Sequence, residues 1–200
     1  MTRIGAILLA GGRATRLGGA AKPLLDVGGR TLLQRAIDAT RGCAPVTIVG
    51  DPVVGVDGAG RVREDPPFGG PAAAIVAALE DWDDDPEWAF VLACDLPGVI
   101  DAAARLRRDL PLLPADTDGV CLGDAGSRPQ WLTGLYRTAA LRRAAASLPD
   151  HGAGASVRAL LDDLAITVLA APTEETDDVD TWEDLERARL RWRGLEAERS

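Results

Sequence analysis

The chain has 200 residues, of which 46% are hydrophobic, and this is enough to bury one good core. Its formal net charge of −9 argues against nucleic acid as a partner, because neutralising phosphates needs a basic face. Three widely spaced cysteines without a C-x-x-C pair indicate neither a disulfide framework nor a zinc site. With no apolar run of membrane-spanning length and no signal peptide, we expect one cytoplasmic domain over residues 1–200 and no membrane partner.

The first half of the chain alternates short apolar runs, typical of buried parallel strands, with helical patterns. We expect strands at Ile4–Ala10, Val46–Val49, Arg61–Glu64 and Trp88–Cys94, and helices at Thr31–Thr40, at Pro71–Leu79 and from Asp101 to about Asp109. Thr31 and Asp101 are expected to cap their helices, and Pro71 suits the first position of a helix. This order predicts a parallel sheet with right-handed crossovers.

The second half is less regular. We expect strands at Gly119–Leu122, Gln130–Tyr136 and Ile166–Ala170, and helices at Thr138–Ser147, at Ser156–Leu164 and from Thr181 onward. An acidic loop, 173–180, precedes the last helix, where Thr181 and Asp184 approximate a capping box. The whole pattern predicts an α/β, single-domain, Rossmann-like three-layer fold with a mostly parallel central sheet and helices on both faces.

A glycine-rich loop follows the first strand and carries the cations Arg13, Arg16 and Lys22. Glycine lets backbone N–H groups approach a phosphate closely, and cationic side chains can then reach its outer oxygens. Lys22 is the only lysine in the chain, since every other basic residue is arginine apart from the single histidine. The loop fits neither the P-loop pattern nor the G-x-G-x-x-G spacing of a dinucleotide fold.

Parallel strands deliver the residues that follow them to one edge of the sheet, where α/β proteins bind ligands. Here those residues are the glycine loop, Asp65 and Asp95. Mg²⁺ binds through one or two carboxylates together with substrate phosphates, so this edge is predicted to hold a metal–nucleotide site. Asp178 and Asp180 near the end of the chain could face this site, and Asp180 could instead cap the last helix. The only histidine, His151, lies in a predicted turn.

The glycine-rich loop resembles the L-A-G-G-x-x-x-R-x-G-x-x-K motif of the MobA-like nucleotidyltransferases, and within them the molybdenum cofactor guanylyltransferases. Ala10, Gly11, Gly12, Arg16 and Gly18 match the motif position by position, and Lys22 follows one residue beyond the place of the motif's lysine. Cys94-Asp95-Leu96-Pro97 matches the family's C-D-x-P, whose aspartate holds magnesium.

Three further segments resemble family segments less closely. Asp65 to Pro71 is similar to D-x-x-P-G-x-G-P-L-x-G, with Ala72 and Ala74 in place of the leucine and the last glycine. Residues 128–136 resemble R-x-Q-P-L-x-A-L-Y, and 178–185 resemble N-x-N-T-P-E-D-L with aspartates for both asparagines.

The resemblance implies a Mg²⁺-dependent nucleotidyltransferase that moves GMP from GTP to the phosphate of molybdopterin and releases pyrophosphate. It implies transient contact with proteins that make or receive this cofactor. The implied catalytic residues are Lys22, Arg16 and Asp95, with Asp95 as the metal ligand. The implied nucleotide-binding residues are Leu9, Ala10, Gly11, Gly12, Lys22, Asp65 and Asp95.

Two alternatives stay open from sequence. The first is a related cytidylyl- or guanylyltransferase with another small phosphorylated acceptor, although Gly12 after Ala10-Gly11 favours the guanylyl branch. The second is a nucleotide-binding regulator that has lost catalysis, an alternative that the altered 178–185 segment leaves open.

Overall fold

The computed structural model describes residues 2–11, 17–51 and 59–198. In this part of the chain seven strands form one sheet, in the spatial order β5-β4-β1-β6-β8-β7-β9. In chain order they are β1 (Ile4–Leu9), β4 (Val46–Val49), β5 (Gly60–Val62), β6 (Trp88–Ala93), β7 (Gly119–Gly123), β8 (Pro129–Arg137) and β9 (Ile166–Ala170). β5, β4, β1 and β6 run parallel to one another, β7 runs parallel to β9, and β8 runs antiparallel to both of its neighbours. The predicted, mostly parallel sheet is confirmed.

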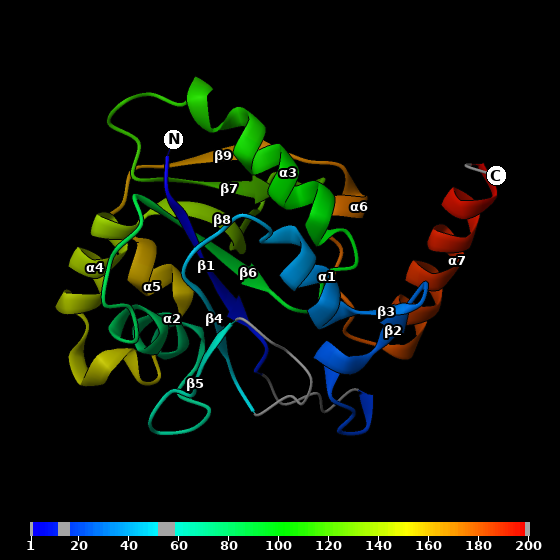
Figure 1. The fold of residues 1–200 in the computed structure, drawn as a ribbon, viewed down its shortest axis with the longest axis horizontal. Coiled ribbons are helices and arrows are strands. Elements are labelled where there is room, and N and C mark those ends of the chain that lie inside the picture. The colour runs from blue at the N-terminus through cyan, green and yellow to red at the C-terminus, as the bar shows by residue number, and fades with distance from the viewer. Residues whose placement is uncertain (1, 12–16, 52–58, 199–200) are drawn as a thin grey trace.

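Helices cover both faces of this sheet (Figure 1). They are α1 (Leu32–Ala39), α2 (Pro71–Glu80), α3 (Val99–Asp109), α4 (Thr138–Ser147), α5 (Val157–Leu161), α6 (Thr173–Thr176) and α7 (Trp182–Glu198), with 3₁₀ turns η2 (Lys22–Leu24), η3 (Leu110–Leu112) and η4 (Pro149–Gly152). Alternate side chains of β1 enter two different cores. Ala6 and Leu8 pack with residues of α1 and α3, whereas Ile7 and Leu9 pack with residues of α2, α4 and α5. The three predicted layers are therefore present.

Local signals set several helix boundaries as the sequence predicts. Thr31 and Gln34 form a reciprocal capping box at the start of α1, with hydrogen bonds of 2.9 and 3.1 Å. Thr181 and Asp184 do the same at the start of α7, with bonds of 2.7 and 3.2 Å. Pro71 occupies the first turn of α2.

Two helix boundaries differ from the prediction. α3 begins at Val99, so Asp101 lies in its first turn and Gly98 is the N-cap. A Cβ atom at Gly98 would lie 1.9 Å from the carbonyl oxygen of Glu174, so the helix starts where glycine permits close packing against α6. α5 is capped by Ser156, whose Oγ accepts from the Ala159 N–H at 3.1 Å, but it ends at Leu161 instead of Leu164. The residues that follow, Asp162 and Asp163, are acidic, which is unfavourable at a helix C-terminus.

A two-stranded ribbon, β2 (Asp26–Val27) with β3 (Arg30–Thr31), was not predicted. Its turn, Gly28-Gly29, has φ angles of 62° and 76°, the conformation of a tight type I′ hairpin. α7 lies beside this ribbon, away from the main sheet (Figure 1). The buried guanidinium of Arg35 stacks 3.8 Å from the ring centroid of Trp192, and this pair fastens α7 to the N-terminal half of the chain. Among the described residues, no helix is both long and apolar enough to cross a membrane.

Candidate functional site

The carboxyl ends of the parallel strands surround a cavity of about 370 Å³. Leu9 and Gly11 line it from the end of β1, and Asp95 lines it from the loop after β6. The ends of β1 and β4 approach each other closely here, because a Cβ atom on Gly50 would lie 2.8 Å from the Gly11 nitrogen. Ala10 also lies where these two strand ends meet, and its N–H donates to the Val49 carbonyl at 2.8 Å. The sheet edge predicted to bind a ligand is therefore hollow and lined partly by backbone.

Two of the predicted site residues, Gly12 and Arg16, lie outside the described residues. Their roles stay predictions.

Lys22 and Asp95, which are far apart in the chain, are brought together. The Lys22 Nζ lies 3.7 Å from Asp95 Oδ2 and donates a hydrogen bond to Asp180 Oδ1. Asp178 completes the group, since one carboxylate oxygen each of Asp95, Asp178 and Asp180 lie within 4.8 Å of one another. One ammonium thus faces three carboxylates, and the formal charge of the cluster is −2 when all four groups are ionised.

The main chain of the segment before α7 is hydrogen-bonded to this cluster. The Val179 N–H donates to the Asp95 carbonyl at 3.0 Å, and the Val179 side chain is buried in a small core with residues of β2 and α7. Alternate residues of an extended segment face opposite sides. With Val179 turned inward, Asp178 and Asp180 both face Asp95. The cap of α7 belongs to Thr181, so the interpretation of Asp180 as the helix cap is wrong.

Burial and mutual repulsion shape the electrostatics of the cluster. Burial raises the pKa of Asp95 from 3.8 to about 6. The nearby Lys22 acts to lower this pKa, whereas the charges of Asp178 and Asp180 act to raise it. Burial and the charge of Asp180 likewise raise the pKa of Asp178. Burial acts to lower the pKa of Lys22, but the hydrogen bond to Asp180 and the surrounding carboxylates raise it overall. A cluster that resists ionisation in this way is suited to an additional cation.

Asp65 is not brought into the cavity. It is exposed and lines a separate hollow with Arg63 and His151. The neighbouring acid, Glu64, lines the cavity instead, and its Oε1 accepts from the Phe68 N–H at 3.0 Å.

Glu64 is a cavity residue that the sequence reasoning missed, although a signal for it was present. In the family segment D-x-x-P-G-x-G-P, the acid precedes the final proline by seven residues. Counting back from Pro71 reaches Glu64, whereas the prediction took Asp65.

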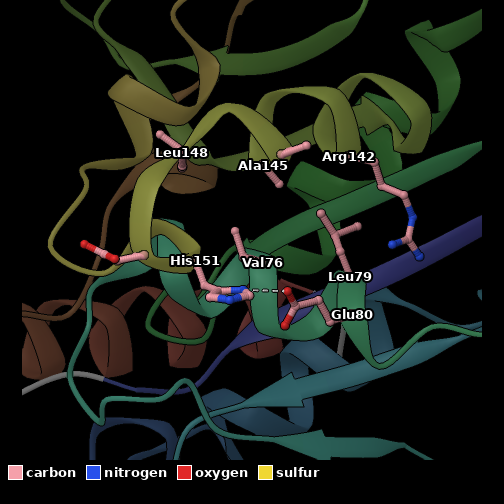
Figure 2. Close-up of a pocket in the computed structure, with 9 residues that line it drawn as sticks. Val76, Leu79, Glu80, Arg142, Ala145, Leu148 and His151 are labelled. Carbon is pink, nitrogen blue, oxygen red and sulfur yellow. Dashed lines mark hydrogen bonds and ion pairs between the residues drawn. The ribbon is translucent and has the colours of Figure 1, made fainter.

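A larger hollow, of about 620 Å³, lies elsewhere, between α2, α4 and η4 (Figure 2). His151 and Glu80 meet across it, with 2.8 Å between His151 Nδ1 and Glu80 Oε1. The His151 side chain is 76% exposed in the turn η4, as the sequence predicts. None of the predicted site residues lines this hollow, so the candidate site is the cavity at the strand ends.

Known proteins share both the sequence pattern and the fold. A molybdenum cofactor guanylyltransferase of Nitrobacter hamburgensis is 39% identical over 118 residues, which cover 55% of this chain and 50% of the relative. A bifunctional protein GlmU of Kineococcus radiotolerans is 34% identical over 166 residues, 82% of this chain and 26% of that protein. The chain therefore spans half or less of the length of these curated relatives.

The crystal structure of Rv0371c from Mycobacterium tuberculosis superposes with a TM-score of 0.71 at 25% identity, covering 94% of this chain and 98% of the other. Residues 6–166 match the MobA-like NTP transferase domain, a stretch that holds β1, the glycine-rich loop, Lys22 and Asp95. The chain belongs to the MobA-like NTP transferase family.

Proposed function

We propose that this chain transfers GMP from GTP to the phosphate of molybdopterin, forming molybdopterin guanine dinucleotide and pyrophosphate. The observation that carries the proposal is the cluster of Lys22 with three aspartates, of which Asp95 lines the cavity at the parallel strand ends. The family of the chain and the name of its relative in Nitrobacter hamburgensis support this reaction.

In the proposed reaction an oxygen of the acceptor phosphate attacks the α-phosphorus of GTP. The new P–O bond forms as the bond to the β-phosphate oxygen breaks, and pyrophosphate leaves with that electron pair. A phosphate monoester is already ionised near neutral pH, so the protein does not need a strong general base. Its work is to position the two phosphates and to offset their charge.

The donor set of the cluster fits magnesium, because carboxylate oxygens are hard ligands and three of them lie within 4.8 Å. Asp95 would hold Mg²⁺ with Asp178 and Asp180 beside it, and the bound ion would neutralise charge on the triphosphate. In this proposal Lys22 leaves the carboxylates and pairs with a phosphate oxygen. Gly11 lines the cavity and has no side chain, so a triphosphate bound there could lie directly against its backbone.

Glu64 favours guanine as the base. A carboxylate only accepts hydrogen bonds, and guanine offers it two donors side by side, N1–H and the N2 amino group. Cytosine offers a single amino group on its corresponding edge. Glu64 lines the cavity from the segment between the end of β5 and the start of α2, whereas Asp95 lines it from the loop after β6, so in this proposal the base lies at Glu64 and the phosphates lie at Asp95.

Thermal unfolding with Mg²⁺ and each of GTP, CTP and ATP tests the nucleotide part of the proposal. Ligand at a hundred times its dissociation constant adds about 2.7 kcal/mol, which raises the midpoint by a few degrees. We expect a magnesium-dependent rise with GTP, followed by pyrophosphate release once molybdopterin is added. A rise with CTP alone would instead indicate cytidylyl transfer, and GTP binding without pyrophosphate release would indicate a regulator.

A further inference from the structure

A second hollow, of about 250 Å³, adjoins Asp95 on the side of β8. It shares Ala93, Asp95 and Leu132 with the cavity described above, so the Asp95 carboxylate belongs to the lining of both. Gln130 and Trp131 of β8 line it, and Asp178 lines it from the segment before α7. Its volume is below the roughly 300 Å³ at which pockets for drug-sized ligands begin, so it suits one small ring system.

The hollow exists because β8 departs from regular pairing at this point. β8 pairs with β7 as far as Gly134, opposite Cys121, and pairing resumes at Gln130, opposite Leu122. Residues 131–133 therefore have no partner on β7, and they bulge at the end of the sheet that carries Asp95. Bulges of this kind redirect side chains and are frequent beside active sites.

Tyr136 fixes the bulge from inside the protein. Its ring lies against two glycines, since a Cβ atom at Gly119 would lie 2.4 Å from Tyr136 Cδ1 and one at Gly134 would lie 2.5 Å from Tyr136 Oη. The fully buried Tyr136 donates its hydroxyl hydrogen to the Trp131 carbonyl at 2.7 Å. The Trp131 backbone is thus held by a rigid, buried side chain, and the wall of the hollow is preorganised.

The charges around the hollow determine where an anionic group of a ligand can lie. The residues that line it include two carboxylates, Asp95 and Asp178, and no lysine, arginine or histidine. An anionic group would be repelled by them, except beside Asp95, where Lys22 and a bound cation offset the charge. The lining also includes Trp131, whose indole is a flat ring, and Gln130, whose Nε2 donates to Asp124 at 3.3 Å.

We propose that this hollow receives the acceptor and that Trp131 stacks on a flat heteroaromatic ring of the acceptor, whose phosphate lies at Asp95. This inference rests on the proposed function and adds the residue that recognises the acceptor ring. Trp131 distinguishes this chain from the family pattern. Residues 128–136 resemble the segment R-x-Q-P-L-x-A-L-Y, which has a proline where this chain has Trp131. The substrate class is therefore a phosphate monoester that carries a flat, hydrogen-bonding heteroaromatic ring.

Neopterin monophosphate, a fluorescent pterin phosphate, is a suitable probe in the presence of Mg²⁺ and a GTP analogue with a non-cleavable α–β bond. Its polarisation reports binding without turnover. Because stacking of a base on an aromatic side chain is lost with the ring, Trp131→Leu should weaken binding about tenfold. Trp131→Phe keeps a ring and should restore most of the affinity. Trp182→Leu removes a half-exposed tryptophan that does not line the hollow, and it should leave binding unchanged.

The inference is overturned if wild-type protein does not bind the probe, or if correctly folded Trp131→Leu binds it as tightly as wild type. It is also overturned if pyrophosphate release from GTP proceeds with the same KM for molybdopterin in Trp131→Leu, and in that case the proposed function stands. Conversely, Trp131-dependent binding of the probe without any GTP turnover would support the ring site and would overturn the proposed function.

Discussion

The two hollows that meet at Asp95 are built from different kinds of structure. The cavity on the β1 side is formed by the ends of parallel strands, and Gly11 and Gly50 bring its backbone segments close together. The hollow on the β8 side is formed by a bulge in the antiparallel strand, and its wall consists of side chains such as Trp131. The β1-side cavity, with its backbone and charged groups, suits the triphosphate, which every nucleotide donor carries. The β8-side hollow, with its side chains, suits the group that differs between acceptors. A substitution in one of them should therefore change the binding of the donor or of the acceptor, but not of both.

Asp95→Asn should affect both the donor and the acceptor side, because Asp95 lines both hollows. The amide keeps the shape of the side chain but removes the charge that would hold Mg²⁺. We expect kcat for pyrophosphate release to fall by about 10²–10³-fold, the loss typical of removing one group that stabilises a charged transition state. The measurement is pyrophosphate release with GTP, Mg²⁺ and molybdopterin. Undiminished turnover would remove Asp95 from the proposed mechanism.

The same substitution should have the opposite effect on the stability of the protein without ligands. The pKa of Asp95 is raised by burial from 3.8 to about 6, so the folded state holds this proton to a higher pH than the unfolded state does. The contribution of this group to the free energy of unfolding is therefore fully present below about pH 4. As the pH rises through 6, the free energy of unfolding of the wild type falls by about 3 kcal/mol.

Asp95→Asn carries no such ionisation. In magnesium-free urea unfolding it should be more stable than wild type near pH 7.5, by up to about 3 kcal/mol, and the difference should vanish near pH 4. An equal difference at both pH values would show that packing, and not the charge of Asp95, is the cause.

Gly134→Ala should act on the β8 side alone. The new Cβ atom would lie 2.5 Å from Tyr136 Oη, so the buried ring must shift and the bulge at Trp131 loses its support. Overpacking of this kind costs about 1–3 kcal/mol of unfolding free energy. We also expect a higher KM for molybdopterin and an unchanged GTP-dependent rise in the unfolding midpoint.

Gly194→Ala is the matched control for this change. Gly194 is exposed on α7 and no heavy atom lies within 4 Å of an added Cβ atom, so this variant should gain about 0.5–1 kcal/mol. If Gly134→Ala were as stable as wild type with an unaltered KM for molybdopterin, Tyr136 would not be what holds the bulge.

Sequence patterns predicted the parallel half of the molecule well. The run from Ile4 and the run from Trp88 are apolar throughout, as strands buried on both faces must be, and their ends delivered Gly11 and Asp95 to one edge. The antiparallel half was predicted as strands but not as a site. The bulge at Trp131 depends on a tyrosine ring that crosses two glycines from two strands, and this packing has no local signature.

The acidic cluster was only partly predictable for a similar reason. Asp178 and Asp180 share a face because they alternate with the buried Val179, a pattern that is visible in the sequence. Their position at Asp95, however, depends on α7 packing against the ribbon at Gly28, where a Cβ atom would lie 1.9 Å from Trp192 Cδ1. Contacts between segments this far apart in the chain are not written in any local pattern.

Glu64 and Asp65 offer the finest test of the β1 side, because adjacent residues of an extended segment face opposite ways. Glu64 lines the cavity and Asp65 lies in a separate exposed hollow, so Glu64→Gln and Asp65→Asn make equal changes of charge on opposite sides of the chain. In the proposed complex the Glu64 carboxylate accepts from both guanine donors, and Glu64→Gln replaces it with an amide that accepts through one oxygen only. We expect the preference for GTP over CTP, measured as the ratio of kcat/KM values, to fall about tenfold.

Asp65→Asn should leave that ratio unchanged, because its carboxylate does not line the cavity. A fall in the ratio with Asp65→Asn but not with Glu64→Gln would restore the original sequence-based assignment of Asp65 to the nucleotide. It would also mean that the loop between β5 and α2 rearranges when a nucleotide binds. Since neither acid contacts the hollow at Trp131, the KM for molybdopterin should stay the same in both variants, which keeps the comparison confined to the donor side.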